Sequence, residues 1–362
     1  MMKEFSTLFS RLIRIKTSTF KSLILFATIV ACAPPEQIIS DNPSKPIQRT
    51  HQFEGYAMGT KWHATVVASS EYNAKEINKA IASALAQVDN LMSTYKETSE
   101  LSKLNKGLLK TKISEETFFV LDKALGVAKS SDGAFDPTIM PIVNLWGFGP
   151  DPAPNQIPTE DSITKALSNI GWEKIKLNKT TLEIEKKDSD LQIDLSAIAK
   201  GYSCDLAGSY LENMGIKRYM IEVGGEICLK GSSPKDRPWR LAIDSPSEKG
   251  FERVIELNNG GLATSGDYRN TRVYNGKIYS HTIDPRSGHP TQHNLASVTV
   301  LAPTCVEADA IATACMVLGG EASLIWINSL QDIEALLIRR TKEGQYLATT
   351  TKGFPENLDV NR

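Results

Sequence analysis

The sequence predicts an α+β fold, with mixed or antiparallel sheets packed against helices. Strand-like alternation and helical periodicity follow one another irregularly, and turn residues separate several strand pairs as in hairpins. The 362 residues are 41% apolar and 23% charged, so the chain can bury a substantial core. That core belongs either to one large domain or to two intimate subdomains.

The N-terminal residues have the composition of an export leader. Basic residues from Lys3 to Lys21 precede the apolar run SLILFATIVA, which is shorter than the roughly 20 residues of a membrane-spanning helix. The order IVAC, residues 29–32, is similar to a bacterial lipobox, in which the cysteine is lipid-modified. We therefore expect a lipoprotein signal peptide over residues 1–31 and a membrane anchor on Cys32, with the protein facing the periplasm. An ordinary signal peptide is the weaker alternative.

The folded domain is predicted over residues 51–352, between a tether and a tail. Residues 32–50 are rich in Pro, Ser, Asn and Gln, which is typical of a flexible tether, and residues 353–362 form the C-terminal tail. The domain opens with strand-like alternation around Met58. Apolar residues at three- and four-residue steps then predict a helix over residues 73–95.

Turn and breaker residues delimit the elements that follow. A second helix is expected from Glu115 to Lys129, before the turn sequence SSDGAFDPT, and the proline-rich residues 151–161 predict a surface loop. Alternation predicts strands in residues 174–196 and 218–232, and in the stretches WRLAIDS, RVIELNNGGLATSG, VYNGKIYSHTID and ASVTVLAP.

Two more helices are expected in the second half of the chain. One follows a strand that ends at Asp194. The other follows Thr304, which has the spacing of a capping box with Glu307, and Gly319-Gly320 is expected to end it.

Charge and cysteine content narrow the possible functions. The net charge is −1, and no block of basic residues lies beyond the N-terminal region, so the sequence carries no electrostatic footprint for nucleic acid. An exported protein meets an oxidising compartment, but the cysteines after Cys32 show neither a CxxC pair nor metal-binding spacing. Cys204 and Cys315 lie in helical patterns among small residues, which favours buried free thiols.

The helix after Thr304 carries a candidate metal site. Asp309 and Thr313 are four residues apart and therefore share a helix face, where a carboxylate and a hydroxyl suit Mg²⁺. Alternatively, Thr313 bonds back to its own helix and Asp309 interacts favourably with the helix dipole. The spacing alone favours the second interpretation.

The helix after Asp194 carries a candidate phosphate site. Its N-terminus offers backbone donors, and Lys200 in the first turns could reach the same anion. Alternatively, Lys200 is solvated, and Ser196 or Asp194 only caps the helix. The glycine-containing loops EVGGEI and ATSGDYRN suggest either close approach to a ligand or simple bulges.

Three of the five histidines of the chain lie within one short stretch. The sequence DPRSG, residues 284–288, is a strong turn signal that would hold His281 at the end of the preceding strand. His289 and His293 follow the turn and are expected to face water. A histidine with a pKa near 6.5 can accept a proton at neutral pH, so His281 is the candidate general base.

Eight motifs together resemble one known family. AMGTKW, MSTYKETSELSKLN, GAFDPTIMPIVNLWGFG, DLSAIAKGYSCD, VGGEI, ATSGDYRN, SHTIDPRSGHP and EADAIATA follow the order found in the ApbE family, the FAD:protein FMN transferases. The resemblance runs from Phe53 to Gly319 and implies an ApbE-like, T-fold-related domain. It also implies a Mg²⁺-dependent reaction, in which a threonine or serine hydroxyl of a recipient protein attacks FAD, AMP leaves, and FMN stays attached.

The resemblance further implies roles for particular residues. His281 would be the base, and the metal would be held by Asp309, Thr313 and the backbone carbonyl of Ala197. The FAD site would be lined by Met58, Tyr95, Ala134, Phe135, Asp136, Asp194, Lys200, Gly224, Gly225, Ser265, Gly266, Asp267 and Ile283.

The expected partner is another protein. The chain contains no Ser-Gly-Ala-Thr-like acceptor stretch, and the resemblance implies a flavoprotein subunit of a membrane redox complex as recipient. Two alternatives remain: an FAD pyrophosphatase that forms FMN and AMP, and a lipoprotein that only binds flavin.

Overall fold

A β-hairpin opens the part of the chain that the computed structural model describes, which is residues 47–358 except 248–249 and 269. Strands β1 (Gln48–Ala57) and β2 (Thr60–Ser69) pair antiparallel. Met58 and Gly59 connect them with φ angles of 52° and 72°, as a tight hairpin turn requires. Met58 therefore lies at a turn between two strands.

The predicted limits of the folded domain need two corrections. The tether does not reach residue 50, because Gln48–Thr50 belong to β1 and pair with β2. The tail is not free of the domain, since Phe354 is buried beside β8 and β9 and the Leu358 N–H donates to the Val254 carbonyl. The predicted signal peptide and Cys32 lie outside the described residues. Within the described part of the chain, no helix has the length and apolar content that crossing a bilayer requires.

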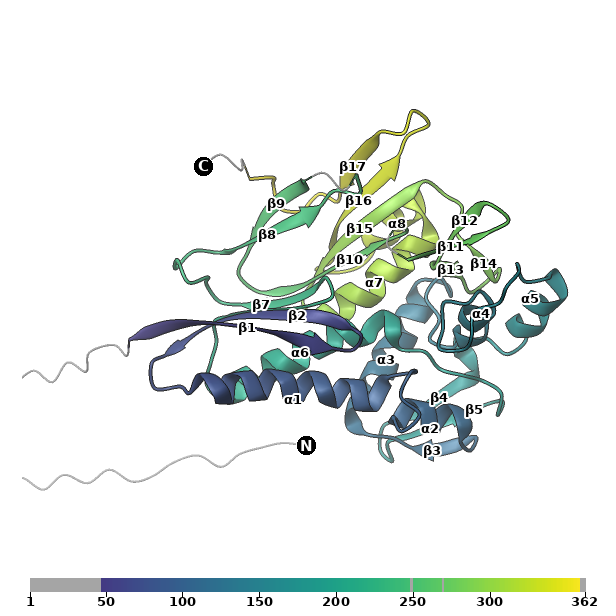
Figure 1. Ribbon diagram of the computed structural model, residues 1–362, viewed down its shortest axis with the longest axis horizontal. Coiled ribbons are helices and arrows are strands. Elements are labelled where there is room, and N and C mark those ends of the chain that lie inside the picture. The colour runs from purple at the N-terminus through teal and green to yellow at the C-terminus, as the bar shows by residue number, and fades with distance from the viewer. Residues whose placement is uncertain (1–46, 248–249, 269, 359–362) are drawn as a thin grey trace, which may run out of the picture. The chain divides into compact units, whose positions relative to one another are not determined.

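The remaining elements alternate irregularly, as the sequence predicts (Figure 1). The helices are α1 (Ala74–Met92), α2 (Glu100–Lys106), α3 (Glu115–Ser130), α4 (Met140–Leu145), α5 (Glu160–Leu167), the 3-10 turn η1 (Trp172–Lys174), α6 (Ser196–Asn213), α7 (Cys305–Leu318) and α8 (Gly320–Ile327). The strands after β2 are β3 (Lys110–Lys112), β4 (Ile175–Asn178), β5 (Glu183–Lys186), β6 (Tyr219–Val223), β7 (Glu226–Lys230), β8 (Trp239–Asp244), β9 (Phe251–Leu257), β10 (Gly260–Gly266), β11 (Thr271–Tyr274), β12 (Lys277–Ser280), β13 (Ile283–Asp284), β14 (His289–Pro290), β15 (Leu295–Ala302), β16 (Glu334–Arg340) and β17 (Tyr346–Thr350).

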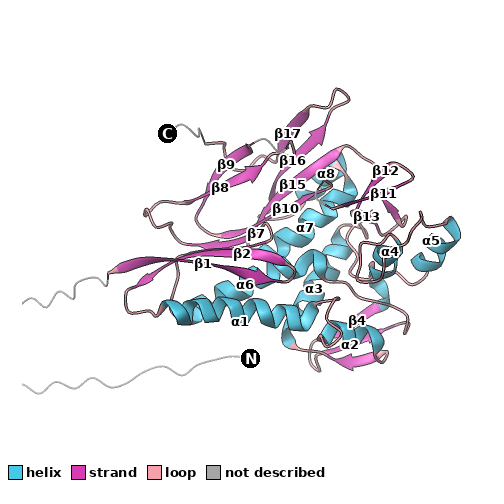
Figure 2. Ribbon diagram, viewed as in Figure 1, coloured by secondary structure: helices cyan, strands magenta, loops and turns pink. Residues whose placement is uncertain are grey.

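A large antiparallel sheet organises the fold. Among the described residues it has eight strands in the order β1-β2-β6-β7-β10-β15-β16-β17. Alternation along the strands sends one set of side chains to each face: in β15, Val300 joins the core cluster of the helical side and Leu301 joins the cluster beneath β8 and β9. Figure 2 shows α1, α6 and α7 along one side of this sheet. The predicted α+β class is confirmed.

The predicted strand ending at Asp194 is wrong. Residues 191–195 are in no strand, because their backbone bonds to other groups. The Asn105 side chain donates to the Ile193 carbonyl and accepts the Ile193 N–H, both at 2.8 Å. The Asp194 N–H donates to the Pro137 carbonyl. The Asn105 amide thus takes the two backbone hydrogen bonds of Ile193 that a neighbouring strand would otherwise form.

The N-terminus of α7 is capped differently from the prediction. Thr304 is the N-cap residue, but its side chain accepts no cap hydrogen bond; its hydroxyl donates to Glu307 Oε2. Instead, the Asp205 carboxylate from α6 accepts the N–H groups of Cys305 and Val306 at 3.0 and 2.8 Å. Burial raises the pKa of Asp205 to about 6, although both N–H bonds act against this rise.

Close packing of α6 against α7 depends on Gly201. A Cβ atom at Gly201 would lie 2.3 Å from the Cys305 carbonyl oxygen and 2.8 Å from the Asp309 Cβ. At the other end of α7, Gly319 has a φ of 81° and ends the helix. Gly320 already begins α8, so the predicted double-glycine stop is wrong at its second residue.

Gly201→Ala should destabilise the fold by about 1–3 kcal/mol, because the added methyl forces α6 and α7 apart. Gly126→Ala is the matched control: Gly126 lies within α3, and a Cβ there meets nothing within 4 Å. This control should gain about 0.5–1 kcal/mol from helix propensity. The measurement is the free energy of unfolding in urea, and a Gly201→Ala protein as stable as the wild type would contradict the packing argument.

Candidate active site

Three charged side chains meet where α6, α7 and β7 come together. Lys200 Nζ donates to Glu226 Oε1 at 3.0 Å and lies 3.8 Å from Asp309 Oδ1. Asp309 and Glu226 are only 2% and 5% exposed. We call these three residues the charge cluster. Buried charges of this kind are expected only where they are paired or hold a ligand.

The backbone of α6 fixes the Asp309 carboxylate. Asp309 Oδ2 accepts the Gly201 N–H at 2.9 Å. In a regular helix the Gly201 N–H donates to the Ala197 carbonyl. The Ala197 carbonyl and the Asp309 carboxylate therefore share one donor. Asp309 lies beyond the first turn of α7, and the Thr313 hydroxyl has no hydrogen-bond partner among the described residues. Neither half of the alternative interpretation is therefore observed.

The charge cluster fits a divalent cation. It contains two carboxylates and one ammonium, and the buried Glu226 Oε2 atom finds no hydrogen-bond partner in the described part of the chain. Asp309 Oδ1, the Thr313 hydroxyl and the Ala197 carbonyl are hard oxygen donors of the kind Mg²⁺ binds, with substrate phosphate completing its shell. Residues 47–358, without the three omitted positions, contain no set of three or more His, Cys, Asp or Glu side chains suited to a metal.

The carboxylates keep Lys200 charged, and its pairing with Glu226 differs from the alternative of a solvated lysine. Burial alone would lower the pKa of Lys200, but Asp309 and Glu226 outweigh it and raise that pKa above its usual value. Burial raises the pKa of Glu226 to about 7. The Lys200 charge lowers this pKa, and the Asp309 carboxylate raises it further. Lys200 therefore stays positively charged and compensates the negative charge of the buried carboxylates.

His281 follows β12 directly, as the turn signal predicts. Its Nδ1 lies 3.0 Å from the Asn270 carbonyl oxygen, and its backbone N–H bonds to the same carbonyl. Because a carbonyl only accepts, Nδ1 of the neutral ring carries the proton and Nε2 keeps a free lone pair. Burial lowers the pKa of His281 below 6.5, and the Lys200 charge acts in the same direction. A ring that is neutral at pH 7 with a free Nε2 is suited to accept a proton.

The two neighbouring histidines have structural contacts. His293 Nε2 lies 2.9 Å from the Met316 carbonyl, and its Nδ1 accepts the Leu295 N–H. The prediction that His293 faces water is therefore wrong, since both ring nitrogens bond to backbone. His289 is half exposed and lies 3.4 Å from Glu160.

Aromatic rings and one arginine lie near His281 and Tyr95. Phe148 meets His281 edge to face, with ring centroids 6.3 Å apart, and the Arg272 guanidinium lies 5.7 Å from the Phe148 ring centre. The Tyr95 ring is 70% exposed. Its pKa is raised by partial burial of the hydroxyl and by the Asp194 carboxylate, while Arg272 opposes this rise. These groups form an open, partly aromatic border to the site.

Other predicted FAD-site residues are already engaged in the fold. Ala134 and Phe135 are buried, and their backbone N–H groups donate to the carbonyl and the hydroxyl of Ser131. Asp136 accepts bonds from the Thr138 backbone and hydroxyl and from the Trp172 N–H, and burial raises its pKa. Asp194 Oδ1 accepts the Ser196 N–H at the start of α6, although the N-cap residue itself is Leu195, which makes no side-chain cap bond.

The glycine-containing loops are turns or strand ends. Gly224 and Gly225 connect β6 to β7, with φ angles of 66° and 110°. Met58 is partly buried against the main core, and Ile283 is buried in a smaller cluster around Trp146. At the end of β10, Ser265 and Gly266 precede Asp267, which forms a two-pronged ion pair with Arg340 at 2.6 and 2.7 Å.

Comparison with known proteins places this arrangement in a family. A family model described as the ApbE family matches residues 58–337. The chain belongs to the ApbE family. The FAD:protein FMN transferase of Haemophilus influenzae is 38% identical over 331 residues, which cover 88% of this chain and 91% of that protein. The Escherichia coli K12 protein of the same name is 39% identical over 74% of this chain and 78% of its own length.

Solved ApbE structures share the fold. The flavin transferase ApbE from Vibrio cholerae has a TM-score of 0.77 and 34% identity, over 84% of this chain and 99% of that one. The apo form of the Pseudomonas stutzeri flavinyl transferase ApbE also has a TM-score of 0.77, at 34% identity over 85% of this chain and 96% of that one.

Sequence reasoning missed several residues of this ApbE site. Glu226 follows the double glycine of the EVGGEI loop directly, but no sequence pattern assigned it a role. Arg340 gave a weaker signal, since it ends the apolar run of β16 beside another arginine. Gly201 and Arg272 gave none, because their importance comes from helix packing and from the neighbouring Phe148 ring. Cys204 and Cys315 are buried free thiols, as predicted.

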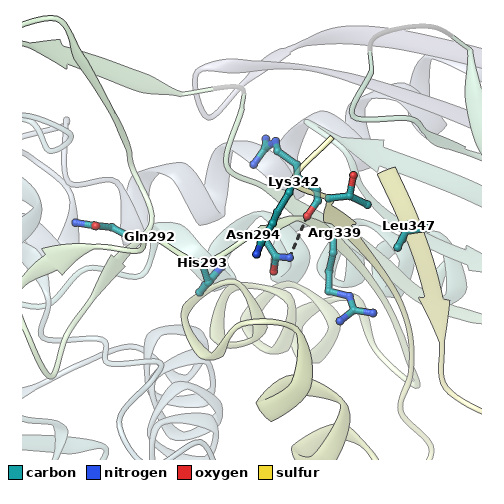
Figure 3. Close-up of a pocket in the computed structure, with 8 residues that line it drawn as sticks. Gln292, His293, Asn294, Arg339, Lys342 and Leu347 are labelled. Atoms are coloured by element: carbon teal, nitrogen blue, oxygen red, sulfur yellow. Dashed lines mark hydrogen bonds between the residues drawn. The ribbon is translucent and has the colours of Figure 1, made fainter. Parts of the chain in front are cut away.

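A shallow groove includes Arg340, the ion-pair partner of Asp267. It encloses about 620 Å³ and is lined by Gln292, His293, Asn294, Arg339, Arg340, Thr341, Lys342 and Leu347. Figure 3 shows the Asn294 side chain bonded to a backbone carbonyl, which is that of Arg340, at 3.0 Å. The charge cluster does not line this groove, so the groove is separate from the candidate metal position.

Nuclear magnetic resonance can test the state of His281. We expect its pKa to lie below 6.5 and its neutral form to carry the proton on Nδ1, as the Asn270 contact requires. The measurement is a ¹⁵N and ¹H titration of the imidazole signals, with His281 assigned by their loss in His281→Gln. A pKa above 6.5, or a proton on Nε2 in the neutral ring, would contradict this geometry.

Proposed function

We propose that this chain is a Mg²⁺-dependent FAD:protein FMN transferase, which moves FMN from FAD to a threonine or serine hydroxyl of a recipient protein and releases AMP. The geometry of the charge cluster supports it most strongly: the Lys200 ammonium lies 3.0 Å from Glu226 and 3.8 Å from Asp309, both of them buried carboxylates. His281, with its Nδ1 fixed by the Asn270 carbonyl, is the candidate base. Lys200 and the candidate metal ligands could thus neutralise the diphosphate of FAD, and His281 could take the proton of a hydroxyl. Relatives that carry this function in their names match most of the chain.

The residues divide the work of phosphoryl transfer. His281 Nε2 takes the proton of the recipient hydroxyl, whose oxygen forms a bond to the phosphorus on the FMN side of FAD. The bond from that phosphorus to the bridging oxygen breaks, and AMP leaves with this oxygen. Lys200 binds and neutralises phosphate oxygens. Asp309, Thr313 and the Ala197 carbonyl would hold Mg²⁺, which when bound supplies further neutralisation of phosphate charge.

The location and partner are part of the same proposal. A lipid on Cys32 would tether the domain to a membrane facing the periplasm, and the recipient would be a flavoprotein subunit of a membrane redox complex. The lipobox-like order at residues 29–32 supports the anchor. The exposed border around Tyr95 supports access by a protein substrate.

The deciding experiment separates three activities. The full-length chain is incubated with FAD and Mg²⁺, with and without a threonine-bearing flavoprotein subunit, and AMP release and the intact mass of the recipient are followed. Release that depends on the recipient, with the mass of one FMN added, supports the transferase. Release of AMP and free FMN without recipient would mean a pyrophosphatase, and binding without release would mean a flavin carrier.

Replacing His281 by glutamine should lower the rate of transfer by about 10²–10⁴-fold, the usual contribution of a general base, while FAD binding persists. In the wild type, kcat/KM should fall as the pH drops below the lowered His281 pKa, because a protonated Nε2 cannot accept. His289→Gln is the matched control and should keep full activity. Transfer by His281→Gln at the wild-type rate would remove His281 from the mechanism.

Asp309→Asn should raise the Mg²⁺ concentration for half-maximal transfer by roughly tenfold or more, since even indirect metal contacts are commonly worth that much. Asparagine can still accept the Gly201 N–H, so the fold should survive. Glu307→Gln, on the same helix but paired with Lys123, is the control. A Mg²⁺ titration identical to that of the wild type would contradict the site.

A further inference from the structure

Lys200 has two possible carboxylate partners, and the structure shows it bonded to one. The Nζ atom is 3.0 Å from Glu226 Oε1, within hydrogen-bonding distance, but 3.8 Å from Asp309 Oδ1. An ammonium and a divalent cation compete for the same carboxylate when both approach it. The position of Lys200 therefore decides how much of Asp309 is open to a metal ion.

Glu226 is held rigidly enough to set that position. It is the first residue of β7, directly after the Gly224-Gly225 turn, and its side chain is buried. The Cys204 thiol donates to the Glu226 carbonyl and ties the strand to α6. Because one Glu226 oxygen binds Lys200 and the other has no partner within the described residues, Lys200 is its sole evident counter-charge there.

Asp309 is fixed from the opposite side. Its Oδ2 is occupied by the Gly201 N–H, so Oδ1 is the oxygen that remains for a cation. This oxygen is the one that faces Lys200. Any shift of Lys200 from Glu226 towards Asp309 would place an ammonium where the metal has to bind.

We propose that Glu226 is a positioning residue that holds the Lys200 ammonium off Asp309 and so keeps this carboxylate open for a divalent cation. The proposal rests on the proposed function only in taking Asp309 as a metal ligand. Glu226 acts through Lys200, the one side chain that its carboxylate bonds among the described residues.

The direct test measures metal binding rather than activity. Mn²⁺ alone is titrated into the full-length chain, and the free ion is followed by electron paramagnetic resonance. Glu226→Gln should weaken Mn²⁺ binding by about tenfold, the lower end of what metal-orienting contacts contribute. Glutamine keeps the size of the side chain but loses the charge that holds Lys200.

A second ion pair between the same two elements provides the matched control. Glu212 in α6 and Lys230 in β7 pair at 2.6 Å, away from the charge cluster. Glu212→Gln removes one α6–β7 ion pair without touching Asp309, so Mn²⁺ affinity should be unchanged. An equal loss in both variants would mean that Glu226 acts only through general stability, and would overturn the proposal.

A double-mutant cycle with Lys200→Met separates positioning from simple charge. If Glu226 acts through Lys200, most of the tenfold loss should disappear when Glu226→Gln is made in the Lys200→Met chain. The same loss in both backgrounds would show that Glu226 acts on the ion by its own charge, which overturns the proposal. Failure of the wild type to bind Mn²⁺ would overturn it as well.

The outcomes for Glu226 and for the function are distinguishable. If the effects of Glu226→Gln and Lys200→Met on Mn²⁺ affinity are coupled but AMP release does not depend on the recipient, the positioning role of Glu226 stands and the proposed transferase function fails. If transfer depends on the recipient but the two substitutions affect Mn²⁺ affinity independently, the proposed transferase function stands and the positioning role of Glu226 fails.

Discussion

The close contact of α6 with α7 at Gly201 is the constraint on which the site depends. Only a residue without a Cβ lets the backbone N–H of α6 reach the Asp309 carboxylate of α7. The same two helices are joined a turn further on, where Asp205 caps the N-terminus of α7. The position of the Asp309 carboxylate is therefore set by helix packing, and the large sheet beneath supports both helices.

Lys200 links the two halves of the chemistry. Its charge is stabilised by two buried carboxylates and at the same time helps to keep His281 neutral. The Lys200 side chain would therefore have two effects: it would offer a positive charge to an anionic substrate, and it would help to keep the lone pair of the candidate base His281 available. Buried charges are costly unless they are compensated, so such a cluster persists only where the surrounding groups are fixed. Gly201, Glu226 and the β6–β7 turn provide that fixation.

Local sequence signals predicted most elements but not the contacts that bring them together. The long periodic helix α1 and the turn after Asp284 were accessible because their signals lie within a few consecutive residues. Short elements such as α2 escaped, since seven residues hold too little periodicity. The Leu191–Leu195 segment looked like a strand because it is extended and apolar, but its hydrogen bonds come from the distant Asn105 side chain.

For the candidate site, motif order identified His281, Asp309 and Lys200, whereas their roles needed geometry. Spacing alone favoured a structural explanation for Asp309, and it did not predict that the Gly201 N–H of α6 would fix this carboxylate. Glu226 could not be assigned from sequence, because its partner Lys200 lies 26 residues earlier on another element. Capping by Asp205 was equally hidden, since it acts on a helix 100 residues away.

His281 follows β12, which among the described residues pairs with β11 alone, whereas the charge cluster belongs to α6, α7 and β7. The candidate base and the candidate phosphate-binding groups thus lie on different secondary-structure elements of one domain. Substitutions in the β11–β12 hairpin can reshape the approach of an incoming hydroxyl while the helix pair stays as it is. Under the proposed mechanism, the part of the chain that meets the acceptor could therefore vary in sequence without changing the helix pair that would hold the diphosphate.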